Sequence, residues 1–195
     1  MEPIQDLVRV LLEADRWIVR SDTRYQVPGG YSDLDVIAVR LNEDTGEVTE
    51  RMWGEVKAHL EHSLTPGYLR AFAREYSSVL DLDHTDLRLT AGEREKLQAR
   101  QTAADEAASY LLGPTYERVL FFAGPRARDE GEGARKLLRP GIQVKWVDGM
   151  LRPMLDKLGH LEGDEPLVRL LTTLKKWGML DKETPGTAPT ARDRA

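Results

Sequence analysis

Apolar residues near the start of the chain recur at the three- and four-residue spacing of a helix. They predict a helix over residues 4–20 and comprise Ile4, Leu7, Val8, Leu11, Leu12 and Ile18. A second helix is predicted over 64–80, because Thr65 can cap its first turn and Pro66 suits its first helical position. The polar stretch 91–112, which ends at a glycine and a proline, predicts a long third helix.

Extended segments are predicted between these helices. A short extended piece at 25–27 ends at the loop residues Pro28, Gly29 and Gly30. A strand over 33–41 and a return strand over 48–57 are joined by residues typical of a hairpin turn. The nearly continuous apolar run 117–123 predicts a strand buried on both faces. The remaining predicted elements are a strand at 142–147 and short helices at 129–138, 150–158 and 166–177.

The order of these elements predicts an α/β fold with a central mixed β-sheet, an N-terminal β-hairpin and flanking helices. Residues 1–183 are expected to form a single domain. Residues 184–195 contain proline, glycine, threonine and arginine without an apolar anchor, so we expect a disordered tail.

Composition limits the classes of protein that fit. The chain has 195 residues, of which 41% are hydrophobic and 31% charged, as expected of a soluble globular domain. It has no cysteine, which excludes disulfides, zinc–thiolate sites and thiol catalysis. No apolar run reaches the length of a membrane span and no secretory signal is visible, so we expect a cytoplasmic protein.

The formal net charge of −5 argues against a surface that binds duplex DNA over its whole area. It leaves room for an acidic metal site beside a local basic strip on one domain.

Charged residues interrupt the two strands of the predicted hairpin. Asp33 and Asp35 lead into an apolar strand, and Glu55 and Lys57 stand at the end of the return strand. Side chains two residues apart on a strand share a face, so we expect these residues to converge at one end of the hairpin. Charged groups within apolar strands are costly unless they serve a purpose, which singles out this site.

Magnesium prefers oxygen ligands and keeps several waters, so one carboxylate from each of two strands can hold it. Asp35 and Glu55 are the candidate ligands, for Mg²⁺ or Mn²⁺. Metal-bound water is a stronger nucleophile, and Lys57 can orient that water or stabilise developing negative charge. The candidate reaction is hydrolysis of a phosphodiester.

These residues resemble the motif of the PD-(D/E)xK nuclease superfamily, which has the restriction-endonuclease-like fold. The resemblance covers roughly residues 4–80: Asp35 with the apolar run 36–39 is similar to the family's acid-bearing strand, and Glu55-Val56-Lys57 to its ExK element. It implies catalysis by Asp35, Glu55 and Lys57, a metal contact from the Val56 backbone carbonyl, and nucleic acid, most often DNA, as substrate. The proline that usually precedes the acid is replaced by Leu34.

The resemblance also implies roles for flanking residues. The helix after ExK faces DNA in many members, so Arg70 and Arg74, four residues apart on one predicted helix face, are candidate phosphate contacts. The alternative is a solvated face. Many members carry a glutamate on the first helix, and Asp6 and Glu13 compete for that position. Cutting two strands would favour a symmetric homodimer.

Other interpretations stay open from the sequence. Asp33 is either a second ligand or a loop residue, and His59 and His62 are either exposed loop residues or metal or acid–base groups. Glu55 and Lys57 could form a purely structural ion pair in an unrelated α/β protein. A catalytically silent binding or scaffold module of the same fold is a further alternative. The choice between DNA and RNA, the preferred substrate structure and the mode of cutting are also open.

Overall fold

The computed structural model describes residues 3–59, 61–82, 89–125 and 131–157. The chain falls into two compact units, Met1–Met154 and Leu155–Ala195, and the first unit is described below. The helix predicted at 166–177, the C-terminal tail and the domain boundary predicted at 183/184 lie outside the described residues.

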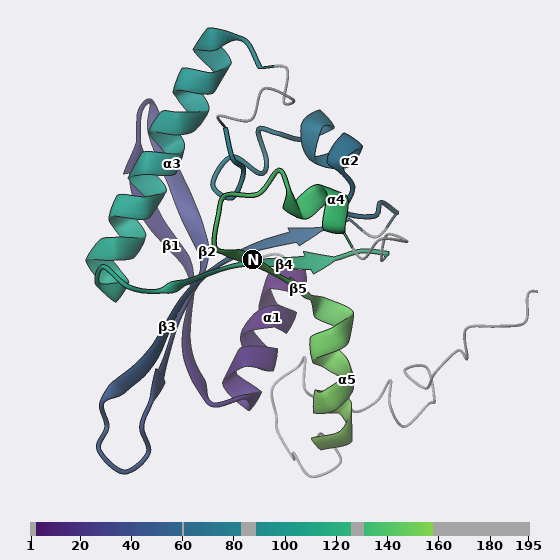
Figure 1. Ribbon diagram of the computed structural model, residues 1–195. Helices are drawn as coiled ribbons and strands as arrows, with labels where there is room; N and C mark the ends of the chain where they lie inside the picture. Colours follow the sequence, from purple (N-terminus) through teal and green to yellow (C-terminus); the bar gives the residue numbers. More distant parts are fainter. Residues whose placement is uncertain (1–2, 60, 83–88, 126–130, 158–195) are drawn as a thin grey trace, which may run out of the picture. The chain divides into compact units, whose positions relative to one another are not determined.

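A mixed five-stranded sheet forms the centre of the first unit (Figure 1). Its strands are β1 (Trp17–Val27), β2 (Gly30–Leu41), β3 (Val48–Ala58), β4 (Glu117–Ala123) and β5 (Ile142–Trp146). They lie side by side in sequence order; β1, β2 and β3 are antiparallel, whereas β4 and β5 continue the sheet in parallel. The predicted α/β fold with a mixed sheet and flanking helices is confirmed.

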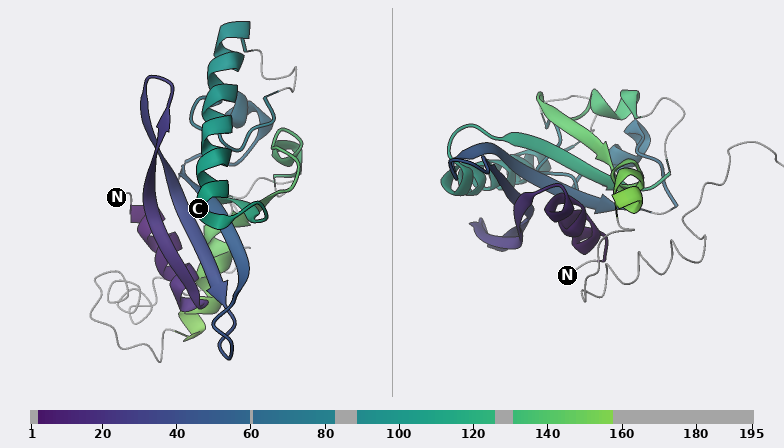
Figure 2. Two further views of the ribbon diagram at one scale, coloured as in Figure 1. Left: turned by 90° about the vertical axis from the view of Figure 1, so that its left-hand side faces the viewer. Right: turned by 90° about the horizontal axis from the view of Figure 1, so that it is seen from below.

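Helices cover both faces of the antiparallel strands. The helices are α1 (Pro3–Ala14), α2 (Pro66–Ala71), α3 (Ala91–Leu112), α4 (Glu132–Arg135) and α5 (Val147–Lys157). Figure 2 shows α1 and α3 on opposite sides of the β1–β2 hairpin. The predicted bounds of α3 are confirmed: a capping box of Thr90 and Glu93 begins it, and Gly113 ends it with φ of 81°. No helix in the described part of the chain is long and apolar enough to cross a membrane.

The predicted helix over 4–20 is too long. Helix α1 ends at Ala14, Arg16 takes a left-handed φ of 64°, and β1 begins at Trp17. Ile18, which fits the helical pattern, is a strand residue with 57% of its surface exposed. Strand β1 pairs with β2 from Trp17 to Val27, and this long ladder of backbone hydrogen bonds replaces the last helical turn and lengthens the predicted extended piece at 25–27.

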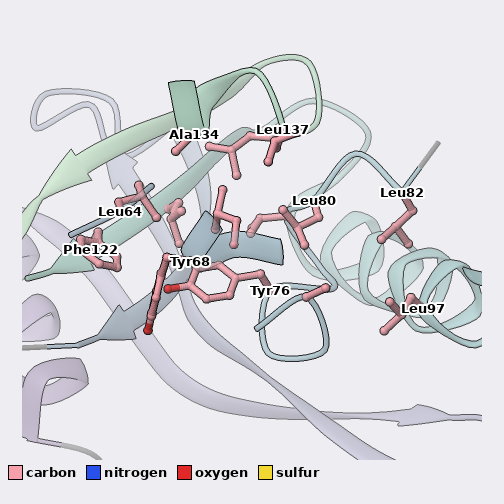
Figure 3. Close-up of a cluster of buried hydrophobic side chains, with 14 of the residues drawn as sticks. Leu64, Tyr68, Tyr76, Leu80, Leu82, Leu97, Phe122, Ala134 and Leu137 are labelled. Carbon is pink, nitrogen blue, oxygen red and sulfur yellow. The ribbon is translucent and has the colours of Figure 1, made fainter. Parts of the chain in front are cut away.

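The predicted helix over 64–80 is also too long. Thr65 caps it as expected, but α2 ends at Ala71 and tight turns follow, in which Glu75 N–H and Val79 N–H donate to carbonyls three residues back. Tyr68 and Tyr76 of this region are buried with Leu80 and Phe122 (Figure 3). Packing of these rings in the core competes with a regular helix. Residues 129–130 of the helix predicted at 129–138 lie outside the described residues, and the described part contains only the short helix α4. Helix α5 begins at Val147 rather than 150.

A second core cluster fixes α3 on the sheet. Leu34, Ile37 and Trp53 of β2 and β3 pack with Leu112 and with two alanines of α3, Ala104 and Ala108, which are fully buried. Small side chains at these positions let the helix backbone approach the strands closely. The C-terminal half of α3 is therefore held against the sheet on the face where the predicted charged residues lie.

Candidate functional site

The pairing of β2 with β3 brings the two predicted acids together. Val36 is paired with Gly54, and the next residues along the two antiparallel strands are Asp35 and Glu55. Directly opposed residues in such a pair have neighbouring side chains on one face. Both carboxylates, together with Lys57, line a single cavity of about 250 Å³. The predicted convergence of Asp35, Glu55 and Lys57 is confirmed.

Asp35 is a carboxyl group with an unfavourable environment for its charge. Burial, with a smaller effect from the nearby Glu55, raises its pKa to about 7, although Lys57 and the Val56 N–H oppose the shift. Its Oδ2 accepts a hydrogen bond from Val56 N at 2.7 Å, which ties β2 to β3 at this point. Asp35 is therefore a group whose ionised form would be favoured by a nearby cation.

Lys57 is held beside Glu55. Its Nζ lies 2.6 Å from Glu55 Oε1, and their side chains are 19% and 9% exposed. Burial acts to lower the pKa of Lys57, but the charges of Glu55 and Asp35 outweigh it and the pKa of the lysine is raised. Lys57 is thus a protonated donor at neutral pH.

The donor set suits a hard divalent cation held by two carboxylates. The hydrogen bond and ion pair above engage one oxygen of Asp35 and one of Glu55, and leave the second oxygen of each. The Val56 N–H points to Asp35 of β2. In an extended strand the N–H and the carbonyl of one residue point to the same neighbouring strand, so the Val56 carbonyl also faces β2. Among the described residues, no three His, Asp or Glu side chains are grouped to hold a metal. An ion here would keep several waters, as Mg²⁺ does.

Three segments outside β2 and β3 complete the cavity. Its rim includes Tyr25 of β1, Arg100 of α3, and four residues that follow α2: Arg74, Glu75, Ser77 and Ser78. Their positions depend on the early end of α2 and on the packing of α3 against the sheet. No local sequence pattern indicates where α2 ends or how α3 packs, so the sequence did not identify Glu75 and Arg100 as cavity residues.

The two predicted phosphate-contacting arginines do not share a helix face, because α2 ends between them. Arg74 lies in the following turns, lines the cavity and places a guanidinium nitrogen 3.0 Å from Glu93 Oε1. Arg70 is exposed in the last turn of α2 and does not line this cavity. Of the two arginines, only Arg74 lines this cavity.

The acids whose role the sequence left open are Asp33, Asp6 and Glu13, and they have different positions relative to the cavity. Asp33 lines the cavity but is 47% exposed; it is a residue of β2 rather than of a loop, and it lies 3.7 Å from Arg24 Nε on the paired strand β1. Asp6 and Glu13 both pair with Arg9, at 3.8 and 3.1 Å. The residue of α1 that reaches the site is Gln5.

Gln5 connects α1 to the strand that carries Asp35. Its buried Nε2 donates to the Asp35 carbonyl oxygen at 2.8 Å and to Asp22 Oδ1 at 2.7 Å. Asp22 has a left-handed φ of 50°, a conformation that aspartate tolerates better than most residues. Gln5 thereby fixes the backbone at Asp35 and is a positioning residue for the site.

His59 directly follows β3 and is half-buried rather than exposed. Its ring packs against those of Tyr68 and Phe72, with centroids 4.8 and 5.7 Å apart, and its Nε2 lies 3.5 Å from Glu75 Oε2. His62 is exposed and stacks on Tyr68 from outside. His59 therefore lies just beyond the end of β3 and contacts Glu75, which lines the cavity.

The buried charge of Asp35 predicts a stabilising substitution. The pKa of Asp35 in the folded protein, about 7, lies above the unfolded value of 3.8, so the folded state binds the proton more tightly. Ionisation therefore costs stability progressively as pH rises from about 4 to about 7, and the full cost persists above that range. We expect Asp35→Asn, which can still accept from Val56 N–H, to raise the free energy of unfolding by about 2 kcal/mol at pH 8.

Urea unfolding without divalent metal at pH 8 and pH 4.5 measures this difference, which should nearly vanish at the lower pH. Asp33→Asn is the matched control, because Asp33 lies in the same strand and is half exposed. It should change stability by no more than about 0.5 kcal/mol at either pH. A destabilised Asp35→Asn at pH 8 would contradict the buried-charge interpretation.

No protein-family model and no curated protein matches the sequence. Among solved structures, the chain is similar to the crystal structure of AF1548, a protein of unknown function. The identity is 14%, the match covers 90% of this chain and 77% of that one, and the TM-score is 0.37. A likeness at this level says nothing about the activity of this protein.

Proposed function

We propose that this protein is a metal-dependent nuclease of the PD-(D/E)xK type, which hydrolyses phosphodiester bonds in nucleic acid, with DNA as the expected substrate. The observation that carries the proposal is the juxtaposition of Asp35, Glu55 and the protonated Lys57 in one solvent-accessible cavity. Two acids on adjacent strands and a lysine two residues after the second acid are the parts that such chemistry needs.

Asp35, Glu55 and the Val56 carbonyl are the groups that would hold Mg²⁺ or Mn²⁺. When bound, such an ion lowers the pKa of a coordinated water and offsets charge on the phosphate. The residues themselves set the geometry: Gln5 holds the Asp35 backbone, and the Val56 N–H orients its carboxylate.

Lys57 is the group that acts on the reacting atoms in this proposal. The Glu55 carboxylate keeps its ammonium protonated and aligned. Its Nζ can donate a hydrogen bond to the attacking water or to a non-bridging phosphate oxygen as negative charge develops there. Arg74 and Arg100 on the cavity rim can contact the phosphates of the bound strand.

Metal binding gives a prediction that does not depend on finding the right substrate. At pH 7.5, millimolar Mg²⁺ or Mn²⁺ should raise the melting temperature of the wild type, because the ion binds the folded site and not the unfolded chain. Asp35→Asn should abolish most of this rise by removing a charged ligand, whereas Asp33→Asn should retain it. A rise of equal size in Asp35→Asn and wild type would remove Asp35 from the metal site.

The proposed activity is tested by incubating the wild type with linear duplex, single-stranded and branched DNA and with RNA, in Mg²⁺, in Mn²⁺ and in EDTA. Cleavage that requires the metal is expected on at least one DNA. An absence of cleavage on all of them would favour the alternative of a catalytically silent binding or scaffold module.

One observation favours that alternative. The direct contact between Lys57 Nζ and Glu55 Oε1 occupies one of the two carboxylate oxygens of Glu55, as a purely structural ion pair would, and leaves a single oxygen for a ligand role. The melting experiment separates the two functions, because a silent module has no reason to be stabilised by the metal through Asp35. A homodimer and a cytoplasmic location, both expected from the sequence, are part of the proposal, and sedimentation with and without duplex DNA tests the first.

A further inference from the structure

A second cavity of about 250 Å³ adjoins the first. The two share Arg74 and Arg100, so these side chains lie between the cavities. The lining differs in character: the first cavity contains the acids of the site, and the second contains three cationic residues, one acid and two leucines. The residues of the second cavity are Arg74, Leu89, Glu93, Lys96, Leu97 and Arg100.

The acid in the second cavity, Glu93, is ionised and its charge is balanced by neighbouring donors. Glu93 Oε1 accepts from Arg74 at 3.0 Å, and its Oε2 accepts from the backbone and hydroxyl of Thr90 at 3.1 and 2.9 Å. These contacts hold the pKa of Glu93 below its usual value. Glu93 therefore compensates Arg74 and the start of α3, and its charge is not directed at the other two cations.

Lys96 and Arg100 are exposed cations that line the second cavity. They are four residues apart on α3 and thus on the same helix face, where like charges repel each other. Within the part of the chain that the structure describes, neither is in an ion pair with a carboxylate. Two adjacent cations beside the apolar Leu89 and Leu97 form a surface suited to an anion that also carries an apolar body.

We propose that the second cavity binds the nucleotide next to the scissile bond, with Lys96 and Arg100 as contacts for its phosphate and the two leucines beneath its sugar or base. This rests on the proposed function, since the first cavity is taken to hold the scissile phosphate. A nucleic-acid strand would then run from the acidic cavity along α3 past Arg74 and Arg100. Such a path is compatible with the acidic net charge of the chain, because the basic residues that would contact the strand are confined to one local surface.

The test compares Lys96→Gln/Arg100→Gln with a control that removes the same charges elsewhere, Arg135→Gln/Lys136→Gln. Arg135 and Lys136 are exposed at α4 and line neither cavity. Binding of fluorescent single-stranded DNA, duplex DNA and RNA oligonucleotides is measured by anisotropy in EDTA, over a range of salt concentrations. The absence of metal prevents cleavage during the measurement.

We expect the Lys96/Arg100 variant to bind the preferred oligonucleotide about tenfold more weakly at low salt. The slope of its salt dependence should flatten by about 0.7 to 0.9 for each phosphate that the variant no longer neutralises. The control should bind within about twofold of the wild type. Equal binding by the two variants would overturn the subsite.

Failure of this inference and failure of the proposed function give different results. If the wild type cleaves DNA and the Lys96/Arg100 variant binds and cleaves as the control does, the nuclease stands and the subsite is wrong. If the wild type cleaves nothing but only the Lys96/Arg100 variant loses binding, the subsite stands as part of a binding module.

Discussion

Lys57→Ala is expected to lower the rate of metal-dependent cleavage by about a hundredfold or more, since loss of one well-placed electrostatic contact to a transition state commonly costs that much. The effect should fall on kcat rather than on KM, because the lysine acts as charge develops and because the cavity-lining Arg74 and Arg100 are still available to bind the strand. The change leaves the buried Glu55 without its ion-pair partner, so folding must be checked alongside activity.

Two further proteins make the result decisive. Lys57→Gln keeps a hydrogen-bond donor beside Glu55 without the charge, and it separates a folding defect from a catalytic one. Lys145→Ala removes a half-buried lysine of β5 that does not line the cavity, and it should cleave as the wild type does. Single-turnover cleavage and thermal melting of all four proteins give the comparison. Full activity of folded Lys57→Ala would place any nuclease site elsewhere in the chain.

Gly54→Ala is expected to destabilise the protein by about 2 kcal/mol and to disturb the site. A Cβ at this position would overlap Phe121 Cε2 and lie 2.9 Å from its Cδ2. The Phe121 ring is fully buried in the neighbouring strand β4 and cannot swing away, so β3 must shift. Because Gly54 directly precedes Glu55, that shift moves the acid and Lys57 relative to Asp35.

Denaturant unfolding measures the loss of stability in Gly54→Ala, with Gly92→Ala as the control. A Cβ on Gly92 meets no atom within 4 Å, and alanine suits a helix better than glycine, so this change should be neutral or stabilising by up to about 1 kcal/mol. Phe121→Leu shortens the opposing side chain and should recover part of the loss when combined with Gly54→Ala. Additive effects of the two substitutions would show that the glycine is not required by the ring.

Local patterns in the sequence were enough to determine β2, β3, β4, α3 and the site triplet. The bounds of α3 follow from Thr90, Glu93 and Gly113, which act on the helix ends within one turn. Asp35, Glu55 and Lys57 were found because charge within an apolar strand stands out from its immediate neighbours. The turn at 42–46 joins the two strands, but a register shift between Arg40 and Leu41 is what brings the two acids opposite each other.

Only the tertiary structure decided where α1 and α2 end and what surrounds the triplet. Residues 15–20 have helical spacing, yet pairing with β2 forms β1, and burial of Tyr68 and Tyr76 ends α2 early. These outcomes come from contacts with distant segments, which a local pattern does not contain. The same holds for Glu75 and Arg100, which line the cavity from distant segments, and for Gln5, which bonds to the Asp35 backbone. It also holds for the pKa of Asp35, which depends on burial and on charges brought close by folding.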